Sequence, residues 1–394
     1  MCPQSSYIYI LGAGASKPDG VPVTKEIFSA AFHGASGPRN DGLSYRLSNQ
    51  TWPKEQILEL QPVFKLFDSW NTTHLEQDLL DLYENKPTPR EFIVDTQRFE
   101  DFYSRLYYMS KGRKYNGCEL TEDQIRNIWQ KAKHLFYHTV GSAGWHRDRR
   151  HYQAFVEKAL TRPGAHCVIS FNIDSLLDDL LYDRCKSFDP RKGDYDRREE
   201  LAWSYGIVFE QTSWPQYYEF FDEAKISYYK LHGSLNWRFD QGSQRTSLCH
   251  PQNPCDCESF RGGGAKDDLL VIPPVEEKDF PLPLRTVWKK ASDKLSKAEE
   301  LCVIGYSAPD VDREAVALLR RTPSSLKRVV IVNPSEDHTQ RILGLLGNPS
   351  GEIVTRYVGF KEYLEKELGG EVLGHNTQTK VKKERIHRIQ QRRS

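Results

Sequence analysis

Five short apolar runs, each followed by a residue suited to ligand contact, constrain the fold of this chain more than any other feature. The runs are Tyr7–Leu11, Cys167–Phe171, Tyr228–Leu231, Leu301–Ile304 and Val329–Val332, with a weaker sixth at Ile353–Val358. Runs of this kind are typical of parallel strands buried on both faces. The residues that follow the five runs are Gly12, Asn172, His232, Gly305 and Asn333. In an open α/β sheet the ligand binds beyond the carboxyl ends of the strands, so these residues are predicted to share one site.

The pattern predicts an α/β fold, a Rossmann-like parallel sheet with helices on both faces, together with a helical insertion. Apolar residues take helical spacing in Glu55–Phe67, His74–Tyr83, Phe99–Tyr108 and Ile125–Val140. The predicted organisation is a discontinuous Rossmann domain at 1–50 and 161–370, the insertion at 51–160 and a basic, disordered tail at 371–394. Helical layers over a nucleotide site commonly act as lids.

Composition limits the expected partners and compartment. The formal net charge is +1, so the balance of charges gives no argument for nucleic acid, membrane or an acidic substrate. Met1–Ser6 lacks the charged region of a signal peptide, and no run approaches the roughly 20 apolar residues of a membrane span. The spacing of the eight cysteines does not resemble a secreted disulfide framework. We therefore expect a cytoplasmic protein in a reducing compartment.

The first apolar run leads directly into a glycine loop, Gly12-Ala13-Gly14-Ala15-Ser16. Glycines at this place let the backbone turn tightly and approach a pyrophosphate, whose charge then lies at a helix N-terminus. The third glycine of the usual fingerprint is missing, which weakens the motif. An ordinary strand-to-helix turn is the alternative interpretation.

Polar residues also follow the second and third runs. Asn172 can orient a water or a ribose hydroxyl, and Asp174 can fix a loop or a ribose. Alternatively, both residues cap the following helix, Ser175–Tyr182. His232, before Gly233, is well placed for general-base work near neutral pH, although a lone histidine is more often a hydrogen-bonded structural residue.

The last two of the five runs end in residues that suit a nucleotide. Gly305 and Ser307 can contact a ribose or a phosphate, and Asn333 can bond a ribose or an adenine edge. A plain helix-capping loop explains the segment 304–312 equally well.

The order of these motifs resembles one family. The succession Gly-Ala-Gly-Ala-Ser, Phe-Asn-Ile-Asp, Leu-His-Gly-Ser, Gly-Tyr-Ser and Val-Asn-Pro is similar to that of the sirtuins, and in particular of their bacterial branch in anti-phage defence systems. Gly20-Val21-Pro22 resembles the Gly-Ile-Pro step of the family, and His74-Leu75-Glu76 loosely resembles a helical feature of the defence branch. The resemblance covers roughly residues 7–35 and 165–335.

The resemblance implies a role for each matched residue. Those implied to bind NAD are Gly12, Ala13, Gly14, Ser16, Gly305, Ser307 and Asn333. The first four would hold the pyrophosphate, and Ser307 and Asn333 would contact the adenosine half. The implied catalytic residues are Asn172 and Asp174, beside the nicotinamide ribose, and His232, a general base acting on the ribose hydroxyls.

Two departures from the family pattern point away from peptide deacylation. Val23-Thr24-Lys25 follows Pro22, where sirtuins that deacylate lysine carry Phe-Arg. The two Cys-x-x-Cys pairs that usually hold zinc are also missing. Cys249, His250, Cys255 and Cys257 could supply four ligands, but their spacing is unlike paired knuckles. We interpret the segment from about 240 to 265 as a solvent-facing loop with reduced thiols and expect no metal site.

The expected function is therefore hydrolysis of NAD to nicotinamide and ADP-ribose, as a toxic effector of phage defence. The expected transition state is oxocarbenium-like, and water replaces the acyl oxygen as nucleophile. A protein-lysine deacylase and a non-catalytic subunit that binds NAD or ADP-ribose are the alternatives. Asn172 and His232 argue against the non-catalytic subunit, because binding alone needs neither residue.

A toxic NAD hydrolase must be kept silent, so we expect a homo-oligomer controlled by a protein partner. The resemblance implies a HerA-type ATPase as one such partner, and the short segment after residue 370 argues against a fused sensor. The basic tail can touch nucleic acid or an acidic surface, but such tails are more often solvated ends.

Overall fold

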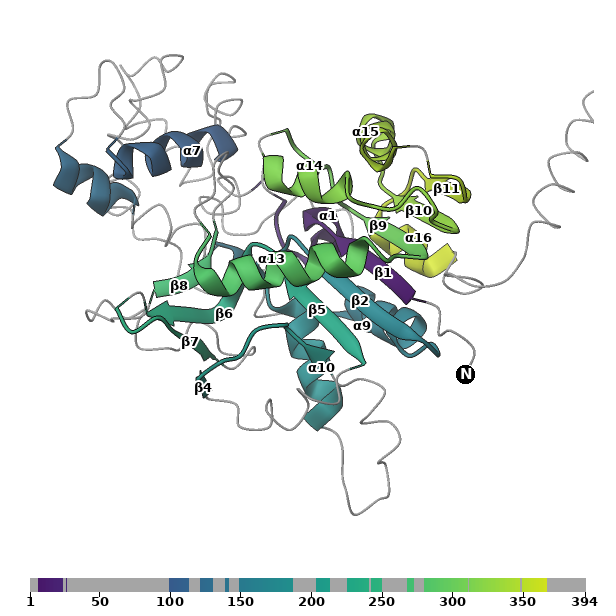
Figure 1. The fold of residues 1–394 in the computed structure, drawn as a ribbon, viewed down its shortest axis with the longest axis horizontal. Helices are drawn as coiled ribbons and strands as arrows, with labels where there is room; N and C mark the ends of the chain where they lie inside the picture. The colour runs from purple at the N-terminus through teal and green to yellow at the C-terminus, as the bar shows by residue number, and fades with distance from the viewer. Residues whose placement is uncertain are drawn as a thin grey trace, which may run out of the picture.

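A computed structural model of the chain describes the following residues: 6–23, 26, 99–112, 121–129, 139–141, 149–186, 203–212, 225–240, 242–249, 268–272, 280–310, 312–347 and 349–366. They form two sheets with helices around the larger one (Figure 1). None of the helices in these ranges is long and apolar enough to cross a membrane.

The larger sheet has seven strands in the order β11-β10-β9-β1-β2-β5-β3, and neighbouring strands pair in parallel. The strands are β1 (Ser6–Leu11), β2 (Ala165–Ser170), β3 (Trp203–Ser204), β5 (Ile226–Lys230), β9 (Glu300–Ile304), β10 (Arg328–Val332) and β11 (Glu352–Arg356). All six apolar runs of the sequence are strands of this sheet. Only β3, which is two residues long, carried no sequence signal. The predicted Rossmann-like α/β fold is confirmed.

Strand β1 forms the centre of the core because it is covered on both faces. Ile8, Tyr9, Ile10 and Leu11 have no exposed surface. Continuous burial of consecutive residues explains why the strand is apolar without alternation.

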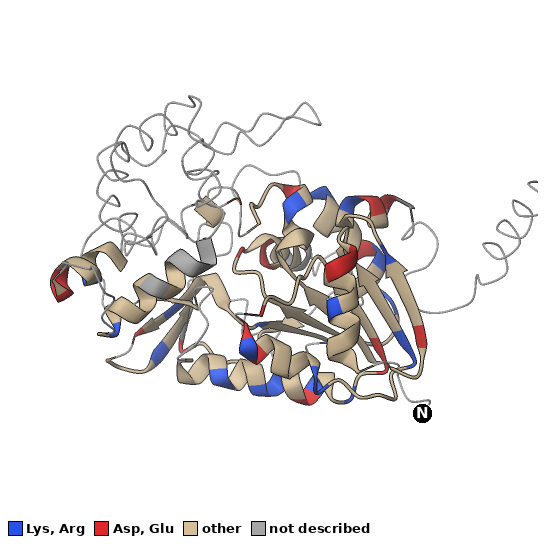
Figure 2. Cartoon of the chain, turned by 90° about the horizontal axis from the view of Figure 1, so that it is seen from above, with Lys and Arg blue, Asp and Glu red and all other residues tan. Residues whose placement is uncertain are grey.

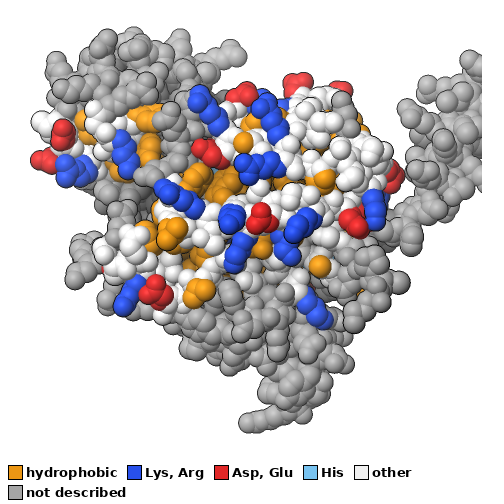
Figure 3. Space-filling model, in the orientation of Figure 1, with side chains coloured by type: hydrophobic (Ala, Val, Ile, Leu, Met, Phe, Trp, Pro, Cys, Tyr) orange, Lys and Arg blue, Asp and Glu red, His pale blue; other side chains and the backbone are white. Residues whose placement is uncertain are grey.

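The helices lie on both faces of this sheet. They are α1 (Ala13–Ser16), the 3₁₀ turn η1 (Lys17–Asp19), α9 (Arg150–Phe155), α10 (Leu176–Lys186), α13 (Leu282–Leu295), α14 (Arg313–Leu319), α15 (Glu336–Leu346) and α16 (Phe360–Lys366). Helix α13 packs on β5 and crosses in front of the strands, whereas α9 packs with α10 and α16 behind them (Figure 1). Figure 2 shows several Lys and Arg positions along the ribbon of α13, and Figure 3 shows Lys and Arg side chains spread over the middle of this face.

A second sheet follows His232 directly. Its order is β4-β7-β6-β8, with β4 (Gln211–Thr212), β6 (Gly233–Asp240), β7 (Arg245–Leu248) and β8 (Asp268–Val271). The interpretation of 240–265 as a loop is therefore wrong for β7. Trp237 of β6 is fully buried against the ring of Tyr205, at 5.0 Å between centroids. Burial of this aromatic pair stabilises the four-stranded sheet against the end of the larger one.

Part of the predicted insertion lies within the described residues. Phe99–Tyr108 is helical as expected, as helix α7 (Phe99–Ser110), and the described parts of Ile125–Val140, residues 125–129 and 139–140, are helical too. Glu55–Phe67 and His74–Tyr83 lie outside the described residues, as does the tail at 371–394. The domain boundaries stay a prediction. Helix α9 and the π-helical segment Val156–Leu160 precede the boundary at 160, and Phe155 packs edge-on against Tyr9 of the sheet.

Candidate functional site

The strand register places the predicted site residues along one edge. Leu11 pairs with Ser170 on one side and Ile304 on the other, and Ser170 pairs with Lys230. Val332 pairs with Ile304 in the same way. The segments that follow these strand ends therefore emerge side by side, as a parallel sheet requires.

Glycines let two of these segments interlock through their backbones. Gly12 N–H donates to Ile304 O at 3.0 Å, and Gly14 N–H donates to Gly305 O at 2.9 Å. A Cβ on Gly12 would lie 2.5 Å from Tyr306 Cα, and one on Gly305 would lie 2.4 Å from Ala15 N. Gly305 also has φ of +61°, a left-handed conformation that favours glycine. Close packing between loops thus already requires Gly12 and Gly305, and a role for Gly12, Ala13 and Gly14 at a pyrophosphate stays a prediction.

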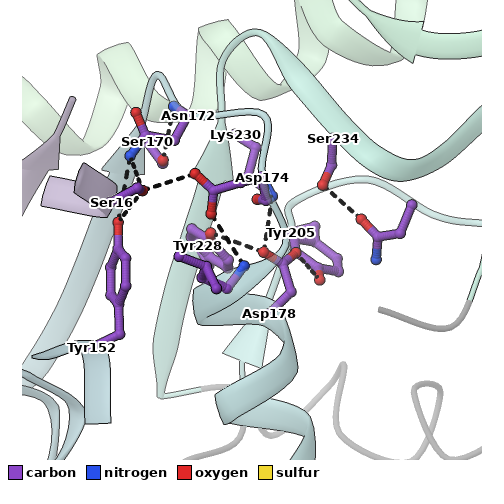
Figure 4. Close-up of polar contacts among 12 residues, drawn as sticks. Ser16, Tyr152, Ser170, Asn172, Asp174, Asp178, Tyr205, Tyr228, Lys230 and Ser234 are labelled. Atoms are coloured by element: carbon purple, nitrogen blue, oxygen red, sulfur yellow. Dashed lines mark hydrogen bonds and ion pairs between the residues drawn. The ribbon is translucent and has the colours of Figure 1, made fainter. Parts of the chain in front are cut away.

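Ser16 is the last residue of the glycine loop, and its hydroxyl contacts three side chains. Its hydroxyl donates to Asp174 Oδ2 at 2.8 Å and lies 2.9 Å from both Asn172 Nδ2 and Tyr152 Oη (Figure 4). The residue is fully buried. We name Ser16, Tyr152, Asn172 and Asp174 the glycine-loop cluster. Ser16 was predicted to touch the pyrophosphate, but here its hydroxyl joins the loops that follow β1 and β2.

Asn172 is held by its amide nitrogen. Nδ2 donates to Gly12 O at 3.0 Å and to Ser16 Oγ at 2.9 Å, and it lies 3.4 Å from Tyr152 Oη. The backbone N–H of Asn172 donates to Ser170 Oγ at 3.1 Å. Among the described residues, Oδ1 has no hydrogen-bond partner. The side chain is therefore fixed with one acceptor oxygen left for a hydroxyl or a water.

Asp174 combines the two roles that the sequence left open. Its Oδ1 accepts from the N–H of Leu176 at 3.1 Å and so caps the start of α10, while Oδ2 accepts from Ser16. The capping interpretation thus applies to Asp174, and helix α10 begins one residue later than predicted. Both oxygens are bonded within the protein, so Asp174 fixes the loop, and a contact of Asp174 with a ribose stays a prediction.

Tyr152 reaches the glycine-loop cluster from helix α9, and a distant residue fixes that helix. Asp19 accepts from the backbone N–H groups of His151 and Tyr152 at 3.3 and 3.1 Å, which satisfies free N–H groups at the start of α9. His151 Nδ1 lies 2.7 Å from Asp19 Oδ1. Burial, together with the nearby Asp174 carboxylate, raises the pKa of Tyr152 well above its ordinary value. The hydroxyl therefore stays protonated and acts as a hydrogen-bond donor or acceptor.

A second polar cluster lies beside the first (Figure 4). Lys230 Nζ donates to Asp178 Oδ2 at 2.8 Å and to the backbone oxygen of Asp174 at 2.5 Å. Tyr205 and Tyr228 donate to the same Asp178 carboxylate at 2.5 and 3.1 Å (Figure 4). We name Asp178, Tyr205, Tyr228 and Lys230 the ion-pair cluster. Burial raises the pKa of Tyr228 well above its ordinary value, with the Asp178 charge as a further cause.

His232 lies beyond the end of β5, among aromatic rings. Its ring meets Phe171 edge-on, at 5.4 Å between centroids, and lies 6.4 Å from the ring of Trp288. Trp288 Nε1 donates to Leu231 O at 2.7 Å, which ties α13 to the residue before the histidine. His232 Nε2 lies 3.0 Å from Asp312 Oδ2. His232 therefore has a defined surrounding of rings and one carboxylate.

The remaining predicted residues lie around the Gly305 segment. Asn333 uses both ends of its amide within the protein, because Nδ2 donates to Tyr306 O and Oδ1 accepts from Ser335 N–H, each at 2.9 Å. It fixes the Gly305 segment, and a contact with adenosine stays a prediction. Ser307 is half-buried, and within the described ranges its hydroxyl makes no hydrogen bond. Phe171 stacks on Tyr306 at 4.2 Å, which joins this segment to the Asn172 loop.

The four potential zinc ligands are only partly described. Cys249 is buried, and the other three residues of the group lie outside the described residues. In the part of the chain that is described, no group of three His, Cys, Asp or Glu residues is arranged to hold a metal ion.

Sequence reasoning assigned no role to Tyr152, Asp178, Lys230 or Asp312. Lys230 and Asp312 stand within motifs that were singled out, and a charged residue inside an apolar strand is itself a signal of a buried partner. Tyr152 lies far from any motif in the sequence, so only the tertiary structure brings it to Ser16.

The sequence matches no family model and no curated protein sequence. The chain is similar to a solved structure of Sir2 in complex with the inhibitor EX-527, 2'-O-acetyl-ADP-ribose and a deacetylated p53 peptide, with 11% identity, 93% of each chain covered and a TM-score of 0.36. It is also similar to a structure from work on the mechanism and regulation of Sir2 enzymes, with 14% identity, 93% of this chain and 92% of that chain covered and a TM-score of 0.35. An overlap this loose assigns neither a family nor an activity to this chain.

Proposed function

We propose that this protein hydrolyses NAD at the bond between nicotinamide and ribose, giving nicotinamide and ADP-ribose. The observation that carries the proposal is the bonding of Asn172 to the glycine loop. Its amide nitrogen donates to Gly12 O and Ser16 Oγ, and its Oδ1 has no partner among the described residues. The loop expected to meet the phosphates and the residue expected to meet the nicotinamide ribose are thus one rigid unit.

The chemistry asks little of the protein beyond orientation. The C1′–N bond breaks, its electron pair neutralises the positively charged nicotinamide nitrogen, and no acid is needed. A water oxygen then bonds to C1′ of the oxocarbenium-like ribose, and the water releases one proton to solvent. Asn172 Oδ1 would orient the water or a ribose hydroxyl, and His232 would act as the general base on a ribose hydroxyl.

The proposed biological role is depletion of NAD as an effector of anti-phage defence. It rests on the sequence resemblance to the defence branch of the sirtuins, as do the proposed homo-oligomer and a controlling partner such as a HerA-type ATPase. Zinc has no part in the proposed reaction, because His232 and Asn172 supply the groups that it uses.

The test is to incubate the purified protein with NAD, alone and with the product of the neighbouring gene, and to follow nicotinamide and ADP-ribose by chromatography. Asn172→Ala and His232→Ala are expected to lose at least about a hundredfold in rate, because each removes a group that acts on the ribose. Lys289→Ala, on the exposed side of α13, is the matched control and should keep the full rate.

Each outcome separates the candidate functions. Nicotinamide released without any peptide, and lost in both site variants, supports the hydrolase. Release that requires an acetyl-lysine peptide would instead identify a deacylase. NAD or ADP-ribose binding without release, alone or with the neighbour, would contradict the proposal and indicate a binding subunit.

A further inference from the structure

Asp312 is the carboxylate in reach of the proposed general base. His232 Nε2 and Asp312 Oδ2 are 3.0 Å apart, and the side chains are only 13% and 6% exposed. The pair lies at ion-pair distance, although the ring nitrogen is not aligned for a regular hydrogen bond. Nε2 is buried and has no other partner among the described residues. A buried ring nitrogen without a partner is unfavourable, and Asp312 Oδ2 at 3.0 Å is the acceptor within its reach.

The Asp312 carboxylate is itself fixed in orientation. Asp312 is the N-cap of α14, where Oδ1 accepts from the N–H of Ala315 at 3.1 Å. The two oxygens are thus divided between two tasks, because Oδ1 faces the helix and Oδ2 faces the histidine. A carboxylate bonded in this way cannot turn without losing the cap.

Two aromatic rings lie beside the imidazole. Phe171 meets it edge-on and the Trp288 ring lies 6.4 Å away, between centroids. Asp312 is its only ion-pair partner within the described parts of the chain. The two nitrogens of the ring are therefore unequal, since Nε2 faces a carboxylate and Nδ1 does not.

We infer that Asp312 is a positioning residue that holds His232 as the Nε2–H tautomer and leaves Nδ1 as the proton acceptor. This inference rests on the proposed function for its catalytic meaning. A carboxylate accepts from a ring N–H and so selects which nitrogen carries the proton, while the other nitrogen keeps its lone pair. Asp312 does not touch the substrate and acts through His232.

Asp312→Asn is the decisive variant because it separates the two tasks. Asn caps a helix as well as Asp does, so α14 keeps its N-terminal bond. The amide NH₂ that takes the place of Oδ2 donates to His232 Nε2 instead of accepting from it. This favours the Nδ1–H tautomer, in which Nδ1 has no lone pair left to accept a proton from the ribose hydroxyl. We expect kcat for nicotinamide release to fall by about 10²–10⁴-fold, with KM changed less than about threefold.

The tautomer is measured directly, on the full chain. Histidine labelled with ¹⁵N gives long-range ¹H–¹⁵N correlations that distinguish Nδ1–H from Nε2–H, and His232→Gln identifies the signal. The expected result is Nε2–H in the wild type and Nδ1–H in Asp312→Asn. The matched control is Ser335→Ala, which removes the side-chain cap of α15 and should change neither the tautomer nor kcat.

The outcomes keep the inference and the proposed function apart. An Nδ1–H tautomer in the wild type, or an unchanged tautomer in Asp312→Asn, would overturn the inference whatever the activity. An unchanged kcat in Asp312→Asn would overturn it as well, and would leave Asp312 as a helix cap only. If the wild type releases no nicotinamide, the proposed function fails, while the tautomer still decides whether Asp312 orients His232.

Discussion

The two polar clusters below the sheet edge are neighbours, but they are built from different interactions. The glycine-loop cluster joins a hydroxyl, a phenol and an amide to one carboxylate, Asp174. The ion-pair cluster holds two full charges, Lys230 and Asp178, both without exposed side-chain surface. Asp174 connects them, because its carboxylate accepts from Ser16 and its backbone oxygen accepts from Lys230.

The difference indicates a division of labour between stability and function. Every oxygen of Asp178 is bonded inside the protein, by Lys230 and two tyrosines, so nothing is left for a ligand. Asn172 in the other cluster keeps Oδ1 free of protein partners among the described residues. We therefore expect changes in the ion-pair cluster to act mainly on unfolding, and changes in the glycine-loop cluster to act mainly on NAD.

Removing the charge of Lys230 should have the largest effect on stability. Lys230→Met leaves the buried Asp178 carboxylate without its counter-charge, which costs about 3–5 kcal/mol in the free energy of unfolding. It also removes the bond to the Asp174 backbone. Urea unfolding followed by tryptophan fluorescence measures the loss.

The control is the double variant Lys230→Met with Asp178→Asn. Asn carries no charge; its amide oxygen can accept from one of the hydroxyls of Tyr205 and Tyr228, and its NH₂ group can donate to the other. The double variant should therefore be more stable than Lys230→Met alone. A loss below about 1 kcal/mol for Lys230→Met would mean that the pair is solvated after all, and the comparison between the clusters would fail.

Disturbing the close backbone contact between Gly305 and Ala15 should give the next largest loss in the free energy of unfolding. In Gly305→Ala the new Cβ would lie 2.4 Å from Ala15 N, and the residue would keep φ of +61°. Left-handed strain of about 1 kcal/mol and overpacking of about 1–3 kcal/mol should together lower the free energy of unfolding. The displaced glycine loop should also weaken NAD binding, as measured by calorimetry.

Gly347→Ala is the matched control for this substitution. Gly347 has φ of +69° at the end of α15, and among the described residues, its chain neighbours apart, no atom lies within 4 Å of the position of a Cβ. It should show the strain of about 1 kcal/mol alone, with NAD binding unchanged. Equal losses in the two variants would show that the contact between Gly305 and Ala15 carries no weight.

The larger sheet could be predicted from the sequence because its strands are buried on both faces. Such strands read as continuous apolar runs, and the parallel topology then sends their ends to one edge. β6 was missed although Leu235, Trp237 and Phe239 alternate with Ser234, Asn236 and Arg238. Its polar residues are buried too, so the alternation does not separate a buried face from an exposed one, as the usual strand pattern would.

The candidate site could be predicted in its positions but not in its bonds. The motifs predicted that Gly12, Asn172 and His232 follow strand ends at one edge of the larger sheet, and the strand register has these strand ends side by side. They did not indicate that Asn333 uses its whole amide within the protein, because a local pattern does not show which atoms a distant loop supplies. Tyr152 and Asp312 reach Ser16 and His232 from segments 136 and 80 residues away in the chain (152 − 16 and 312 − 232).

Two substitutions that each delete a single oxygen atom should have the smallest effects on stability, and they compare the two clusters most directly. Tyr228→Phe and Tyr152→Phe each remove one buried hydroxyl and keep the ring. Tyr228 bonds a charged carboxylate and should cost about 1.5–3 kcal/mol in unfolding, whereas Tyr152 lies between Ser16 and Asn172 and should cost about 1 kcal/mol.

Activity should follow the opposite order, which is why this pair tests the division of labour directly. Tyr152→Phe removes one of the groups that hold Asn172, so nicotinamide release should fall by up to about tenfold, a change of about 1.4 kcal/mol in the activation barrier. Tyr228→Phe should leave the rate unchanged, because among the described residues the phenol bonds only the Asp178 carboxylate, outside the glycine-loop cluster. If the less stable variant were also the slower one, activity would simply track stability, and the two clusters would form a single structural unit.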